Sequence, residues 1–145
     1  MEQDNKAVVR RLVEEFQSQG NVATAEELMS IDFINHTARP GAPNDRQGVI
    51  DLFSRFRAAF PDFRAEIHDQ VAEDDLVVTR KTFYGTHKAD YYGAPATNRE
   101  VAILVIDIVR VVDGKLIEHW GLMDQFSLLQ QIGAIPARQQ AALTR

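Results

Sequence analysis

The chain has 145 residues, of which 45% are hydrophobic and 26% charged, and its formal net charge is −5. This length and composition are typical of one globular domain, here residues 1–145, and the lack of cysteine excludes disulfides, thiolate catalysis and cysteine-ligated metals. Because the basic residues are dispersed and no apolar run is long enough to span a bilayer, we expect a cytoplasmic protein that binds neither nucleic acid nor membrane.

The N-terminal third has helical periodicity. A broad apolar stripe predicts a helix that opens at Asp4 or Asn5 and closes at Gly20. Asn21 is a suitable cap for a short second helix, which should end near Ser30.

A loop and a third helix follow. The segment Asp32 to Asp45 contains proline and glycine and has no period, which predicts a loop over the mouth or side of the domain. Asn44 or Asp45 caps the next helix, and Pro61 stops it. The apolar stripe of this helix includes Phe53, Phe56 and Phe60.

The period changes to two from Phe63 onward, which indicates strands. Further strands are predicted at Leu76–Gly85, Glu100–Val112 and Lys115–Asp124, and a last short helix runs from about Ser127 to Ile132. Helices followed by strands predict an α+β fold with a curved antiparallel sheet.

The dipeptide Asp113-Gly114 between two β-rich runs predicts a two-residue hairpin turn in which Val112 pairs with Lys115. In that register one face carries polar and aromatic pairs: Val109 with Glu118, Asp107 with Trp120, Val105 with Leu122, and Ile103 with Asp124. The other face, which includes His119, is nearly all aliphatic. Because helices cover only one face of such a sheet, we expect a homodimer that forms through the outer face.

Asp124 is a candidate acid/base. It ends the last strand on the predicted face of Trp120, where burial beside an indole would raise the pKa of its carboxyl group. The alternative is that Asp124 only caps the helix that follows. Asp107 on the same face could be catalytic, although pairing with Arg80 or with the indole N–H of Trp120 is the simpler interpretation.

His36 and His87 could also reach a cavity, because His36 begins the loop after Phe33 and His87 follows a point where a strand must bend. Hydrogen bonding to loop backbone is the alternative for each. The four histidines have no metal-ligand spacing, and no nucleotide-binding, P-loop or serine-hydrolase motif is present. We therefore expect no metal and no cofactor.

Several short segments form a pattern that spans nearly the whole chain. They are Asn5–Arg11, Asp32–His36, Phe60–Phe63, Gly85–His87, Asp107–Arg110, Asp113–Trp120 and Leu128–Gly133. In content and order they resemble the SnoaL-like polyketide cyclase family of the nuclear transport factor 2-like superfamily. The chain departs from many relatives at two positions. It has Gly121 after the tryptophan, where they have an acidic residue, and it has Lys81 after Arg80, where tryptophan is common in the relatives.

The resemblance implies a cone-shaped, cystatin-like α+β barrel, with N-terminal helices packed on the concave face of the sheet around a pocket. Characterised members close a ring of an aromatic polyketide methyl ester by intramolecular aldol condensation without metal or organic cofactor. Their acid/base aspartate maps onto Asp124, with His87 as a second candidate catalytic residue. We expect the ligand, a small apolar or aromatic carbonyl compound, to contact His36, Phe33, Phe53, Phe56, Arg80, Asp107 and Trp120.

Two alternatives to a cyclase remain. The same pocket could bind a small molecule without converting it, or it could catalyse an isomerisation or hydration. Both enzymatic hypotheses need Asp124 to titrate abnormally, and the binding hypothesis does not.

Overall fold

The computed structural model describes residues 1–136. The helices are α1 (Glu2–Arg11), its π-helical continuation η1 (Leu12–Ser18), α2 (Val22–Leu28), α3 (Arg46–Ala59) and α4 (Gln125–Gln131). The strands are β1 (Met29–Asn35), β2 (Arg64–Glu73), β3 (Leu76–Thr86), β4 (Glu100–Val112) and β5 (Lys115–Met123). Within this part of the chain, no helix is long and apolar enough to cross a membrane.

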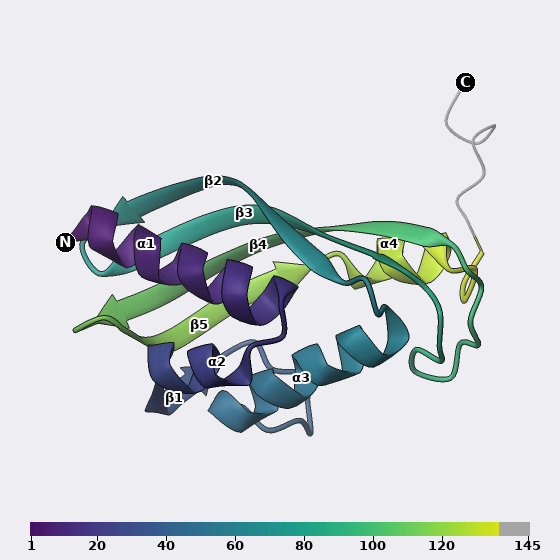
Figure 1. Ribbon diagram of the computed structural model, residues 1–145, viewed down its shortest axis with the longest axis horizontal. Helices are drawn as coiled ribbons and strands as arrows, with labels where there is room; N and C mark the ends of the chain where they lie inside the picture. The colour runs from purple at the N-terminus through teal and green to yellow at the C-terminus, as the bar shows by residue number, and fades with distance from the viewer. Residues whose placement is uncertain (137–145) are drawn as a thin grey trace.

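The strands form one curved sheet in the order β1-β5-β4-β3-β2, in which β1 is parallel to β5 and the other pairs are antiparallel. Figure 1 shows α1, α2 and α3 on one side of this sheet, and α4 beyond the end of β5. The sheet does not close, because β1 and β2 remain as edges. The predicted α+β cone, with its N-terminal helices on the concave face, is confirmed.

The phenylalanine stripe of α3 forms the aromatic part of the core. Phe53 meets Phe16 with ring centroids 5.3 Å apart, and Phe56 stacks on Phe63 at 5.2 Å. Such pairs add about 0.5–1.5 kcal/mol each beyond the burial of their area. The helix that carries them begins where predicted, because the Asp45 side chain accepts a hydrogen bond from the Gly48 N–H at 2.8 Å.

The predicted loop from Asp32 begins too early, because β1 continues to Asn35. This edge strand buries Phe33 but leaves Ile31 and Ile34 exposed, and its register with β5 shifts between Met29 and Ile34. An irregular edge strand with no regular alternation gives no period-two signal.

The Asp113-Gly114 turn is confirmed, with positive φ at both residues, and Val112 pairs with Lys115 as predicted. The predicted register beyond it is wrong. Val111 pairs with Leu116 but Arg110 pairs with Glu118, so Ile117 is an extra residue in β5. A bulge of one residue moves every later side chain of that strand to the other face.

The bulge decides which side chains of β5 point toward the helices. Asp107, on the buried face of β4, is opposite Gly121 rather than Trp120. Trp120 pairs with Ile108 on the outer face, and His119 pairs with Val109 on the concave face. The predicted positions of His119 and Trp120 are therefore exchanged.

The outer face of the sheet exposes aliphatic side chains, including Leu104 at 61%, Ile106 at 53% and Leu122 at 80% of their full area. The homodimer expected through this face stays a prediction. The aliphatic character on which it rests is present in the structure.

Candidate functional site

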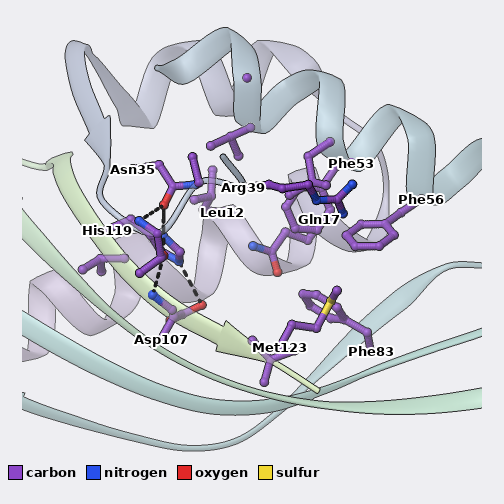
Figure 2. A pocket seen from close by; sticks show the side chains of 18 of the residues that line it. Leu12, Gln17, Asn35, Arg39, Phe53, Phe56, Phe83, Asp107, His119 and Met123 are labelled. Atoms are coloured by element: carbon purple, nitrogen blue, oxygen red, sulfur yellow. Dashed lines mark hydrogen bonds and ion pairs between the residues drawn. The ribbon is translucent and has the colours of Figure 1, made fainter. Parts of the chain in front are cut away.

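A cavity with a volume of about 330 Å³ lies between the N-terminal helices and the concave face of the sheet. That volume lies within the usual range for small-molecule sites. Figure 2 shows aromatic and aliphatic side chains entering the cavity from the helices above and the strands below. The apolar lining includes Leu12, Phe33, Phe53, Phe56, Phe83 and Met123.

A buried ion pair lies in the cavity wall formed by the sheet. The Lys81 Nζ is 2.8 Å from Asp107 Oδ2 and donates a hydrogen bond to Gln17 Oε1 at 3.1 Å. The lysine and aspartate are 2% and 5% exposed, so solvent screens their attraction weakly. Lys81 points inward because it alternates along β3 with outward-facing Arg80.

The Asp107 carboxylate is ionised in this arrangement. Burial acts to raise its pKa, but opposing positive charge, chiefly that of Lys81, outweighs burial and holds the pKa well below its ordinary value. Its second oxygen, Oδ1, is buried and has no hydrogen-bond partner in the described part of the chain. A buried carboxylate oxygen without a donor is one that a bound molecule could satisfy.

His119 is held beside this carboxylate by Asn35. The Asn35 Oδ1 accepts hydrogen bonds from the backbone N–H and the hydroxyl of Thr37, both at 3.2 Å, so it is an oxygen that can only accept. His119 Nδ1, 2.8 Å away, must therefore carry a proton and donate it. In the neutral ring the other nitrogen, Nε2, is then an unprotonated acceptor.

The free nitrogen of His119 faces Asp107. Its Nε2 lies 3.8 Å from Asp107 Oδ2, too far for a hydrogen bond but close enough for an ion pair once the ring is protonated. Figure 2 shows the chain of contacts from Asn35 through His119 to Asp107. This arrangement places an unprotonated ring nitrogen opposite a fixed carboxylate in the cavity wall.

Four of the residues predicted to bind ligand line the cavity: Phe33, Phe53, Phe56 and Asp107. The predicted partner of Asp107 is wrong, because Arg80 lies on the exposed side of β3 and pairs with Asp69 at 2.7 Å. Arg80 is therefore outside the cavity.

Trp120 and His36 lie together outside the cavity lining. Their rings stack with centroids 4.9 Å apart, and His36 Nε2 is 2.8 Å from a carboxylate oxygen of Glu118. Neither residue lines the cavity, and for Trp120 the cause is the bulge at Ile117. Contact of His36 and Trp120 with a ligand stays a prediction.

The two predicted catalytic residues are not among the lining residues, although Asp124 stands between the lining residues Met123 and Gln125. Asp124 is exposed, and its Oδ1 accepts a hydrogen bond from the Ser127 N–H at 3.0 Å, so it caps α4 as the alternative interpretation had it. His87 is fully buried against Phe60, with Nδ1 3.0 Å from Thr97 Oγ1. The roles expected for Asp124 and His87 have no support from this geometry.

Sequence reasoning did not single out Lys81, Gln17, Asn35 or His119 as site residues. Lys81 carried a usable signal, because the alternation Val77, Thr79, Lys81, Phe83 places a cation on the buried face of a strand. His119 carried none, since its face depends on the bulge. Within residues 1–136, no three histidine or acidic side chains are grouped as metal ligands.

Residues 7–132 match the family described as SnoaL-like polyketide cyclase. The aklanonic acid methyl ester cyclase DnrD of Streptomyces peucetius is 26% identical over 130 residues, which are 87% of this chain and 88% of that protein. The aklanonic acid methyl ester cyclase DauD of Streptomyces sp. (strain C5) is also 26% identical over 130 residues, which are 87% of this chain and 80% of that protein.

Among solved structures, IdmH of Streptomyces antibioticus, described as a candidate polyketide cyclase, is 31% identical with a TM-score of 0.79, over 89% of this chain and 98% of that one. AclR of Streptomyces galilaeus, described as a candidate hydroxylase, is 24% identical with a TM-score of 0.85, over 99% and 89% of the two chains, and shows a shared fold.

Proposed function

Because the chain belongs to the SnoaL-like polyketide cyclase family, we propose that it closes a ring in a small polyketide-like carbonyl compound by intramolecular aldol chemistry in the internal cavity. The observation that carries this proposal is the His119 ring, whose free nitrogen faces the buried Asp107–Lys81 pair in an otherwise apolar cavity. The relatives named as cyclases of aklanonic acid methyl ester support the reaction class.

In the proposed reaction, His119 Nε2 removes a proton from a carbon that is activated by neighbouring carbonyl groups. The enolate carbon then attacks a second carbonyl of the same molecule, a C–C bond forms, and the new alkoxide takes the proton back from His119. Asp107 stabilises the imidazolium between these two steps, and the Lys81 charge in the same wall favours the enolate. The proposed reaction uses no metal or organic cofactor.

A domain that only binds its ligand would not need the unprotonated His119 nitrogen opposite the ionised Asp107 carboxylate, one oxygen of which has no hydrogen-bond partner in the described part of the chain. An isomerase or hydratase would use the same groups. The aldol reaction is preferred because the relatives are named as cyclases.

Proton-to-deuterium exchange tests the proposal without knowledge of the natural substrate. A panel of polycyclic β-keto esters is incubated in heavy water with protein dialysed against a chelator, and loss of the activated C–H signal is followed by NMR. We expect exchange above the buffer rate for at least one compound that binds. If the compounds that bind exchange only at the buffer rate, the proposed catalysis is contradicted and binding without catalysis is the remaining function.

The variant Gly121→Ala is expected to slow this exchange without unfolding the protein. A Cβ at residue 121 would lie 2.7 Å from Cε1 and 2.8 Å from Nε2 of His119, so the ring must move from its position beside Asp107. We expect a loss of about tenfold or more, since small misplacements of catalytic groups are costly. An unchanged exchange rate with an unchanged melting temperature would contradict the proposed role of His119.

A further inference from the structure

The lining residues that remain exposed mark the rim of the cavity. Arg39, from the loop after β1, and Arg55, from α3, are both exposed, and Tyr92, from the segment between β3 and β4, is 49% exposed. Asp107 and Lys81 are buried in the wall. Figure 2 shows Arg39 on the helix side of the cavity and Asp107 on the sheet side.

The rim carries two positive charges that the described part of the chain does not neutralise. Within residues 1–136, neither Arg39 nor Arg55 has a carboxylate oxygen within 4.0 Å. Asp107 is the one carboxylate among the lining residues, and Lys81 balances its charge. Among the lining residues, Arg39 and Arg55 are thus an excess of positive charge in a chain whose net charge is −5.

The two arginines line the same cavity, Arg39 from the loop after β1 and Arg55 from α3. Burial raises the pKa of the Tyr91 hydroxyl to about 12, and the charges of both Arg39 and Arg55 act in the opposite direction. Arg39, Arg55 and Gln125 line the same cavity, and Gln125 accepts a hydrogen bond from the Tyr91 hydroxyl at 3.0 Å.

Arg39 is also held in place. Its guanidinium carbon lies 4.2 Å from the centre of the Tyr92 ring. Tyr92 has a left-handed backbone, with φ of 47°, in a tight turn closed by the Tyr91–Ala94 bridge and by the Gly93 N–H bond to Asp90. A guanidinium stacked on an aromatic face keeps its N–H edges free, and these edges match the two oxygens of a carboxylate.

We propose that the ligand carries a free carboxylate, which binds Arg39 and Arg55 at the rim while its apolar rings occupy the cavity. The inference rests on the proposed function for the carbonyl chemistry and adds the acid group to it. Two relatives are named for a methyl ester, which has no charge to offer these arginines. The expected substrate therefore carries a free carboxylate in addition to the carbonyl groups that react.

The test compares two ligands of the same ring system by isothermal titration calorimetry: anthraquinone-2-carboxylate and its methyl ester. Wild-type protein is expected to bind the carboxylate about tenfold or more tightly, with a preference that shrinks as added salt screens the exposed charges. The double variant Arg39→Gln/Arg55→Gln should bind both ligands alike. Arg10→Gln, which removes an exposed arginine of α1, should keep the preference.

The inference is overturned if the ester binds as tightly as the carboxylate, if neither binds wild type, or if the preference survives in the double variant. Tighter binding of anthraquinone-2-sulfonate than of the carboxylate would also overturn it. These results are independent of catalysis. If the protein prefers the carboxylate but exchanges no carbon-bound proton, the proposed catalytic function is wrong and the proposed acid-binding rim stands.

Discussion

Replacement of Lys81 by methionine is expected to lower the free energy of unfolding by about 3–5 kcal/mol, because it leaves the buried Asp107 carboxylate without its charged partner. The methionine has a similar length and fills similar space, so lost packing contributes little. Urea unfolding followed by far-ultraviolet circular dichroism measures the change.

The neighbouring residue on the same strand gives a matched control. Arg80 forms an exposed ion pair with Asp69, and Arg80→Met should cost about 0–1 kcal/mol. The double variant Lys81→Met/Asp107→Leu should recover most of the stability lost in Lys81→Met, because it removes both buried charges. Equal losses in Lys81→Met and Arg80→Met would contradict the buried pair.

The same pair predicts the direction of acid sensitivity. The pKa of Asp107 is lowered in the folded protein, so its contribution to stability is complete above the ordinary aspartate pKa of about 3.9 and is lost as the pH falls through the lower folded value. In Lys81→Met this part of the acid dependence should be largely absent.

The variant His119→Gln is expected to reduce the rate of β-keto ester exchange by about 10²–10⁴-fold, the usual contribution of a general base. Glutamine can keep the hydrogen bond to Asn35 but cannot accept a proton from carbon. Asp124→Asn should change the rate by less than about twofold, since Asp124 is exposed and caps α4. The exchange assay in heavy water compares the three proteins under identical conditions.

The exchange rate of Asp124→Asn distinguishes His119 from Asp124 as the catalytic base. If Asp124→Asn abolished exchange and His119→Gln did not, the acid/base group would be the one implied by family resemblance. Melting temperatures of both variants must stay near that of wild type for the rates to be compared.

The fold was predictable because its signals are local. The apolar stripes of α1 and α3, the Asp45 cap and the Asp113-Gly114 turn each depend on residues a few positions apart, and each is confirmed. The strand β1 was missed because its pairing with β5 is long-range and irregular, and an edge strand that exposes Ile31 and Ile34 has no pattern of its own.

The sequence predicts the site residues that lie on helices or on β4, and it misplaces those that follow the bulge in β5. The apolar stripe of α3 predicts Phe53 and Phe56. Asp107 lies in β4, and the bulge, which is in β5, does not change the face to which Asp107 points. His119 and Trp120 come after the extra residue Ile117, so their faces are exchanged. A bulge has no sequence signature in this hairpin, and the register of β5 can be known only from its pairing.

The role of His119 as the base is tested most directly by the protonation of its ring nitrogens, measured by long-range ¹H–¹⁵N correlation NMR on ¹⁵N-labelled protein, with His119→Gln to assign the signals. We expect a neutral ring protonated at Nδ1, where it donates to Asn35, with Nε2 free to accept a proton in the cavity. A neutral ring protonated at Nε2 would contradict it, because that nitrogen could not then act as the base.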